Sequence, residues 1–209
     1  MAGPGRAPMN APAHERLLEA ILVALAEDGY DNLQLGRVLA ESGVSEAEFA
    51  AAYGGLERCL EAAYERLCQR LLQSASAACR MSEEWPRRVW CGLEALLGEL
   101  AAAPALARAL THSFPAIGPQ AYQRYIAFLE AFVPVFAEGR QYSEAGEELP
   151  SSVEMLAIGA GETIVLDEIE AGRSVHLDEV APSILFSVLV PFVGTERAVE
   201  EMRGKVAIG

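Results

Sequence analysis

Few side chains in this sequence combine the types and the spacing that enzyme chemistry requires. No H-E-x-x-H metal motif, no G-x-S-x-G nucleophile motif and no glycine-rich phosphate loop with a lysine is present. The acidic pairs Glu83–Glu84 and Glu147–Glu148 stand in expected loops or helix starts, where carboxylates are solvated. The sequence predicts a protein that is not an enzyme, with no catalytic residue and no cofactor. An α-helical enzyme acting in an aromatic pocket is the weakest alternative.

Metal binding is not expected either, because the candidate ligands do not cluster. The sequence has three separated histidines and four cysteines without a Cys-x-x-Cys pair: His14, His112, His176, Cys59, Cys68, Cys79 and Cys91. We expect these cysteines to be packing residues in a reducing cytoplasm, with a redox-sensing thiol as the alternative. Met1–Ala13 lacks the apolar core of a signal peptide. The apolar stretch Ala181–Gly194, broken by prolines, is shorter than the about 20 residues of a membrane span.

Charge limits the possible partners. Thirty acidic residues stand against 16 basic ones, which gives a net charge of −14 and an isoelectric point near 4.6. Such a surface repels phosphate backbones and anionic membranes. Hydrophobic residues make up 52% of the 209 residues, so the chain can bury a core, and disorder should be confined to its ends.

Helical spacing of apolar residues runs through the chain after Met1–Ala13, and no stretch alternates with a period of two, so we expect an all-α fold. Leu17, Ile21 and Leu25 form one stripe of a first helix over 14–28. A second helix over 34–42 is followed by Gly43, which permits a tight turn. Ser45 can cap a third helix that ends near Tyr53.

The rest of the chain predicts a longer helical domain. Ser82 is the candidate cap of one helix, Pro104 should end that helix, and Pro134 should kink an aromatic-rich one. The expected helices cover 56–80, 85–103, a short segment to Thr111, 119–138, 151–171 and 177–193. The polar segment 139–150 is typical of an exposed, mobile loop.

Two short helices joined by a glycine turn are the plan of a helix-turn-helix module. The string that sharpens this match is Gly29-Tyr30-Asp31-Asn32, Leu35, Val38, Ser42-Gly43-Val44-Ser45, Phe49, Tyr53 and Leu60. It resembles the N-terminal domain of the tetracycline-repressor (TetR) family. The resemblance implies a flexible arm over 1–13, a DNA-binding domain over 14–60 and a ligand-binding and dimerisation domain over 61–209.

The match is good at packing positions and departs on the side that would meet DNA. Gln34, Ala50, Ala52 and Leu56 stand where the family usually has residues that contact phosphates or bases. Residues 14–60 contain three basic and nine acidic residues, a net charge of −6, whereas DNA-binding modules are usually basic. Ser45 and Glu48 have the spacing of a capping box, which is the favoured role of Glu48 over a base contact.

The resemblance implies a repressor that is released from operator DNA by a small apolar or aromatic ligand and forms a homodimer through its last two long helices. The residues assigned to DNA are Arg16, Gln34, Arg37, Ser45, Glu46, Ala50 and Tyr53, with Arg6 as an extra phosphate contact. The residues assigned to the ligand are Trp85, Trp90, His112, Phe114, Tyr122, Tyr125, Phe128, Phe132 and Met155. The alternative is a dimer of the same fold that binds a ligand or a protein but no operator.

Overall fold

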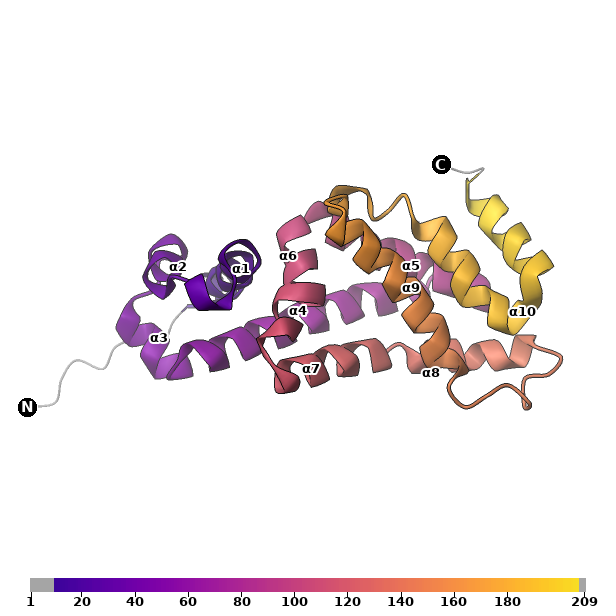
Figure 1. The fold of residues 1–209 in the computed structure, drawn as a ribbon, viewed down its shortest axis with the longest axis horizontal. Coiled ribbons are helices and arrows are strands. Elements are labelled where there is room, and N and C mark those ends of the chain that lie inside the picture. The colour runs from indigo at the N-terminus through magenta and orange to yellow at the C-terminus, as the bar shows by residue number, and fades with distance from the viewer. Residues whose placement is uncertain (1–9, 207–209) are drawn as a thin grey trace, which may run out of the picture.

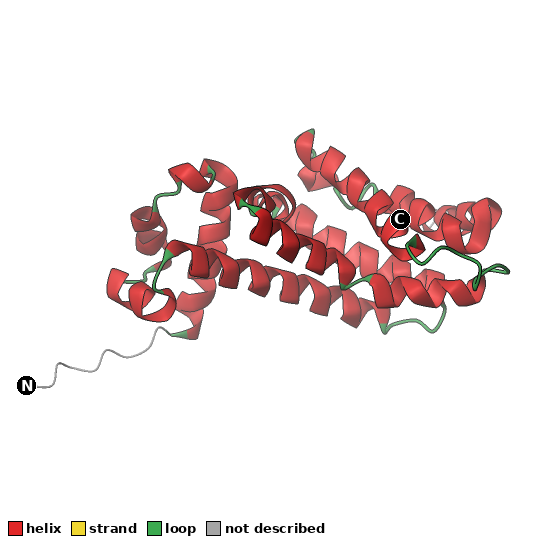
Figure 2. Ribbon diagram, turned by 60° about the horizontal axis from the view of Figure 1, so that its bottom comes forward, coloured by secondary structure: helices red, strands yellow, loops and turns green. Residues whose placement is uncertain are grey.

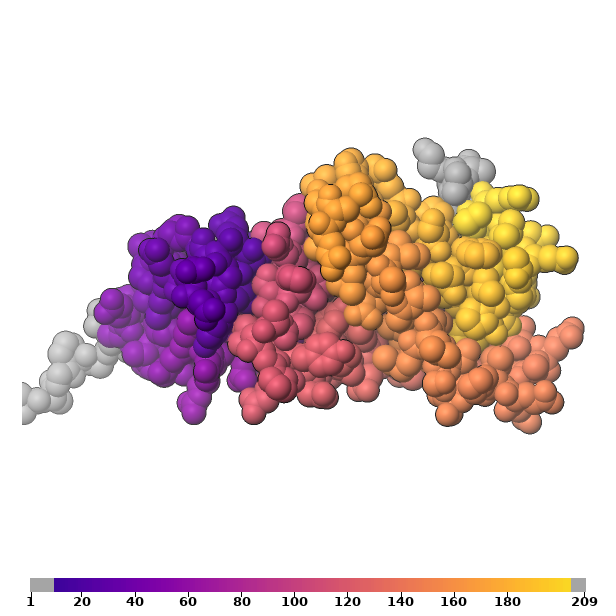
Figure 3. Space-filling view, viewed as in Figure 1, coloured from indigo at the N-terminus to yellow at the C-terminus, as the bar shows by residue number. Residues whose placement is uncertain are grey.

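The molecule is elongated and built from helices and loops (Figures 1 and 2). The computed structural model describes residues 10–206, and within them no strand occurs. Helices α1 (Ala11–Asp28), α2 (Leu35–Ser42) and α3 (Glu46–Tyr53) form a lobe at one end, which the space-filling view shows at the left (Figure 3). The predicted all-α architecture is therefore confirmed for the described part of the chain.

Helix α1 starts one turn earlier than the apolar stripe suggests. The side chain of Asn10 accepts a hydrogen bond of 2.9 Å from the backbone N–H of Ala13, and Pro12 stands in the first turn. Both features stabilise a helix start. The expected arm boundary at residue 13 is therefore wrong, and the expected contact of Arg6 lies outside the described residues.

Helix α4 (Leu56–Cys79) leaves this lobe and runs along the second domain (Figure 1). It packs against α5 (Trp85–Ala102), which is followed by α6 (Pro104–Arg108) and a π-helical turn over Ala109–Ser113. Ser82 does not cap α5, because Glu84 precedes the helix and no side chain caps it. Pro104 ends α5 as predicted, since the next helix starts there.

The expected helix over 119–138 is broken into two. Helix α7 (Pro119–Glu130) ends at Ala131, and α8 (Val133–Ala137) begins two residues later. Pro134 lies in the first turn of α8, where its missing N–H costs no intrahelical hydrogen bond. The proline therefore starts a new helix instead of kinking one.

The segment expected to be an exposed loop, 139–150, is anchored at its start. Glu138–Tyr142 forms a 3-10 turn, and Gly139 is buried so closely that an added Cβ would lie 2.5 Å from Trp85 and 2.8 Å from Phe192. Arg140 donates to both carboxylate oxygens of Glu154, at 2.5 and 3.1 Å, and to three backbone carbonyls of residues 146–150. The prediction of an exposed loop is therefore wrong for the start of the segment, around Gly139 and Arg140.

Helices α9 (Val153–Glu170) and α10 (Ala181–Val206) complete the second domain. The last helix begins four residues later than predicted, after a 3-10 turn over Ser174–His176, and bends at Gly194, whose φ is 76°. By length and composition Ala181–Arg203 passes as a membrane span. However, the bend divides it into pieces shorter than about 20 residues, and Leu185, Leu189 and Phe192 are buried in the core.

The Arg140–Glu154 pair predicts a measurable stability effect. Glu154 is only 5% exposed, so Arg140→Met should leave a buried carboxylate without its cation and lower the midpoint of thermal unfolding by roughly 5 °C or more. The double variant Arg140→Met/Glu154→Leu should recover most of this loss. Arg66→Met, which breaks an exposed pair with Glu15, is the control and should change the midpoint little.

The same pair predicts the pH dependence of this effect. Arg140 holds the pKa of Glu154 below its usual value. The pair therefore contributes its full stabilisation at pH values above the unfolded-state pKa of Glu154, and this contribution is lost as the pH falls through the lower, folded-state pKa. The difference between wild type and Arg140→Met should therefore shrink below about pH 4. A difference that persists in acid would contradict this assignment.

Candidate functional site

The turn between α2 and α3 has the geometry of a helix-turn-helix. Gly43 adopts φ 72° and ψ 26°, a left-handed conformation that glycine accepts without strain. Ser45 then caps α3, because its side chain accepts from the N–H of Glu48 and its own N–H donates to the Glu48 carboxylate at 2.9 Å. Val38 and Phe49 pack beneath the turn. The predicted capping role of Glu48 is confirmed.

The residues assigned to DNA divide into exposed and occupied ones. Gln34 is exposed at the start of α2, and Glu46 and Ala50 are exposed on α3. Arg37 is ion-paired with Asp28 and lies 4.0 Å from Glu41. The Arg37 guanidinium is therefore engaged within the module and is less free to bind a phosphate.

Three further assigned residues make internal contacts. Arg16 donates from Nε and Nη2 to the carbonyl of Ser42, each at 3.3 Å. Ser45 is engaged in the capping box. Tyr53 is 9% exposed, stacks on His14 at a centroid distance of 6.0 Å and hydrogen-bonds to its Nε2. Burial raises the pKa of Tyr53 to about 12, so its hydroxyl stays protonated within the module.

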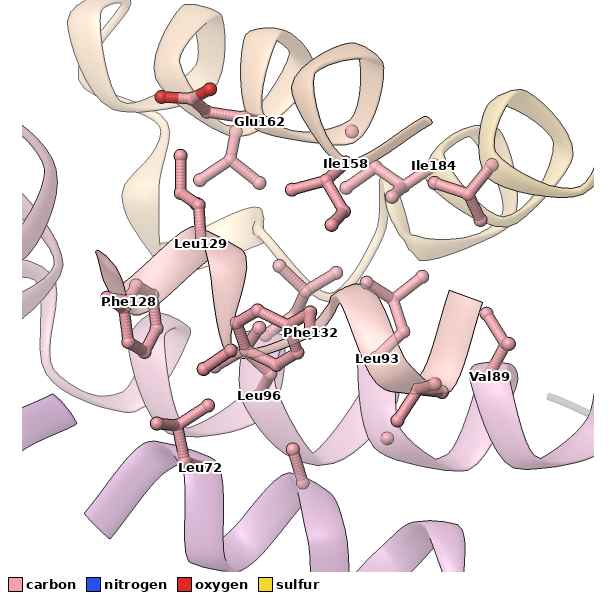
Figure 4. A pocket seen from close by; sticks show the side chains of 18 of the residues that line it. Leu72, Val89, Leu93, Leu96, Phe128, Leu129, Phe132, Ile158, Glu162 and Ile184 are labelled. Atoms are coloured by element: carbon pink, nitrogen blue, oxygen red, sulfur yellow. The ribbon is translucent and has the colours of Figure 1, made fainter. Parts of the chain in front are cut away.

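A partly enclosed cavity of about 290 Å³ lies in the second domain. Its walls come from α4, α5, α7, α8, α9 and α10, and Figure 4 shows Leu93, Leu96, Phe132 and Ile158 around it. The lining is almost entirely apolar. Its polar side chains are Ser76, Cys79, Thr111, Tyr125 and Glu162, and no lysine, arginine or histidine is among the described residues that line it.

Three of the nine predicted ligand residues line this cavity: Tyr125, Phe128 and Phe132. The structure places the others elsewhere. Trp85 is fully buried against Phe192, and its Nε1 donates to the carbonyl of Val135 at 2.7 Å. Phe114 stacks on Tyr64 at 3.9 Å. Trp90 is buried outside the lining, Met155 packs against the core, and His112 and Tyr122 are exposed.

The sequence reasoning missed the leucines and the one carboxylate of the cavity. Leu72, Leu93 and Leu96 are half-buried because they face the cavity rather than a neighbouring helix. Glu162 is a lone charged residue in an apolar stretch of α9, and this pattern alone could have indicated a polar group facing a cavity. It accepts a hydrogen bond of 2.5 Å from the Tyr125 hydroxyl.

A π-helical turn connects the cavity to the first lobe. Leu110 and Thr111, in the turn Ala109–Ser113, line the cavity. The carbonyl of Leu110 accepts from the hydroxyl of Tyr64 on α4 at 3.2 Å, and the turn also packs on α1. Such turns occur frequently at functional sites. The turn that lines the cavity is thus in direct contact with both α4 and α1.

The outer face of α9 is apolar and uncovered by the described part of the chain. Leu156 is 64% exposed, an added Cβ on Gly159 would meet nothing within 4 Å, and Ala160 is exposed. The opposite face is covered, since Gly161 packs against Ile184 of α10. Ile184, Leu185, Val188 and Leu189 of α10 are buried within one subunit.

No protein-family model and no curated protein sequence matches the chain. Among solved structures, the fatty acid degradation regulator FadR from Bacillus halodurans matches with a TM-score of 0.74 and 14% identity, over 84% of this chain and 97% of that one. The transcriptional regulator FadR from Bacillus subtilis, in complex with stearoyl-CoA, matches with a TM-score of 0.63 and 14% identity, over 86% and 97%.

These neighbours have the TetR-like arrangement of a helix-turn-helix module followed by a helical ligand-binding domain, so the predicted fold class is confirmed. Both neighbours are named as regulators.

The capping box predicts the effect of removing one hydroxyl. Ser45→Ala should lower the free energy of unfolding by about 1 kcal/mol, because the N–H of Glu48 loses its acceptor. Ser45→Asp keeps an acceptor at this position and should retain most of the stability. Ser82→Ala is the matched control, because Ser82 caps no helix. Urea titrations followed by circular dichroism measure all three, and an equal loss at both serines would argue against the capping role.

Proposed function

We propose that this protein is a homodimeric, DNA-binding transcriptional regulator, a repressor that leaves its operator when an apolar small molecule occupies the second domain. The observation that carries the proposal is the 290 Å³ apolar cavity walled by α4, the helix that also packs on the DNA-binding module. Cavities of this kind, mostly apolar with a few polar groups, are typical of ligand sites.

The volume supports a ligand with an apolar part of moderate length. At about 290 Å³ the cavity lies near the lower end of the range of about 300–1,000 Å³ that is typical of small-molecule sites. The molecule bound by the Bacillus subtilis neighbour, stearoyl-CoA, carries a long acyl chain.

Ligand binding would act through α4 and the π-helical turn. Leu72, Ala75 and Cys79 of α4 and Leu110 of the turn all line the cavity. A ligand that pushes these walls apart shifts α4 against α1, which changes the separation of the two α3 helices in a dimer. Operators with two half-sites tolerate only a fixed separation.

Dimerisation is proposed through the outer face of α9 with α10. An apolar helix face is normally buried, yet Leu156, Gly159 and Ala160 of α9 face away from the subunit core. A second copy of the chain that covers this face would remove the exposed leucine from water. Gly159 leaves room for a close approach of the two helices.

A second candidate is a dimer of the same fold that senses a ligand without binding an operator. Its specific support is that Arg16 and Arg37 make internal contacts and that Glu46 is the exposed charged side chain on α3. In the first candidate, by contrast, phosphate contacts would depend on backbone N–H groups at the starts of α2 and α3.

The operator proposal predicts that one side chain on α3 controls DNA affinity. Wild type should bind a duplex from upstream of its own gene more tightly than a scrambled duplex, with affinity that falls between about 50 and 200 mM salt. Ala50→Glu should reduce this affinity at least about tenfold, because a carboxylate would enter the groove. Ala127→Glu, at an exposed position on α7, is the control. Fluorescence anisotropy measures both, and no binding by a folded dimer at low salt would favour the second candidate.

The dimer proposal predicts the effect of a charge on α9. Leu156→Glu should weaken self-association at least about a hundredfold, because two leucines, each worth about 1.5–3 kcal/mol on burial, are lost from one interface. Val175→Glu changes a residue that is 55% exposed outside α9 and α10 and should leave the dimer intact. Sedimentation velocity distinguishes the species, and a monomeric wild type would refute the assignment of this face.

A further inference from the structure

We infer that the cavity selects apolar molecules that carry a protonated amine, and that Glu162 is the residue that selects them against fatty acids and other anions. This inference rests on the proposed ligand-binding function and adds the chemical class of the ligand. It also separates this chain from its structural neighbour, whose bound molecule is stearoyl-CoA.

The position of Glu162 is the first argument. Its carboxylate lies at one edge of the apolar side chains that surround the cavity (Figure 4). The Tyr125 hydroxyl donates to Oε1 at 2.5 Å, while Oε2 has no hydrogen-bond partner among the described residues. Burial, together with this carboxylate, raises the pKa of Tyr125 above its ordinary range. The phenol therefore remains a donor that orients Glu162, and one oxygen is left to accept from a ligand.

The charge of the lining is the second argument. Glu162 is the only charged side chain among the described residues that line the cavity. A carboxylate accepts hydrogen bonds and donates none, and in an apolar site its attraction to a cation and repulsion of an anion are stronger than in water. An ammonium group offers three donors and the opposite charge, whereas a ligand carboxylate or phosphate at this edge would meet only repulsion.

The remaining polar groups do not reverse this preference. Ser76 and Thr111 are neutral, and the Thr111 hydroxyl already donates to the carbonyl of Ala107 at 3.0 Å. The Cys79 thiol is held neutral, because burial raises its pKa, and it donates to the carbonyl of Arg88. The net charge of −14 adds a long-range field that attracts cations and repels anions.

Isothermal titration calorimetry of the full-length protein with three probes of equal chain length tests this inference. Decylamine, decanol and decanoate, each kept below its solubility limit and as dissolved monomers, share the same number of carbon atoms and differ in the head group. We expect decylamine to bind at least about tenfold more tightly than decanol, since its ammonium adds the attraction of opposite charges in an apolar site to the hydrogen bond that both molecules can donate. Decanoate should bind more weakly than both.

Two variants locate the effect. Glu162→Gln keeps the size of the side chain and removes its charge, so it should abolish the preference for decylamine over decanol. Glu170→Gln removes an exposed charge from the end of the same helix and should leave the preference as in wild type. Circular dichroism establishes that both variants fold, and the probe series on wild type is informative without them.

The outcomes separate the two proposals. Decanoate bound as tightly as decylamine, or a Glu162→Gln variant that keeps the amine preference, would overturn the assignment of Glu162 and leave a ligand cavity in place. Binding of decanol alone would do the same. Failure of all three probes to bind the folded protein would overturn this inference together with the proposed ligand-binding function.

Discussion

Helix α4 is the element that both halves of the protein share, and its continuity constrains the rest of the structure. Twenty-four residues at about 1.5 Å per residue form a rod of about 36 Å. Cys59 and Leu60 in its first turns are buried, the helix packs on α1, and its last turns wall the cavity beside α5. An unbroken helix bends little, so under the proposed mechanism a change in the spacing of α4 and α5 would also move α4 against α1.

The acidic surface sets the second constraint, on how such a module would hold DNA. The arginines nearest the helix-turn-helix have structural tasks, because Arg16 satisfies the carbonyl of Ser42 next to the Gly43 turn and Arg37 pairs with Asp28. These contacts stabilise the turn and reduce the number of free cations. At the start of α3 the capping box already uses the backbone N–H groups of Ser45 and Glu48. Under the proposed operator function, phosphate contacts would therefore depend on the remaining backbone N–H groups at the starts of α2 and α3, which bind phosphates without any basic side chain.

The sequence predicts best what is decided locally. The Gly43 turn and the Ser45–Glu48 cap depend on a few neighbouring residues, and both appear as expected. The anchoring of Gly139 and Arg140 depends on Trp85, Phe192 and Glu154, which are distant in the chain, so polarity alone misleads there. The cavity shows the same limit, because an aromatic residue such as Trp85 or Phe114 fills a core as well as it lines a cavity. Only the packing of six helices decides which leucines face empty space.

A single carboxylate in an apolar wall carries a cost of burial that the surrounding leucines do not have. A fully enclosed and unpaired Glu162 would be costly, whereas its place at the edge of the cavity, with Tyr125 as donor, lowers that cost. The fold therefore tolerates a carboxylate at position 162 of α9, because this side chain takes no part in the packing of α4 on α5. Ligand chemistry on a TetR-like fold can then change through one side chain on α9, without any change in the helix α4 that would carry the signal.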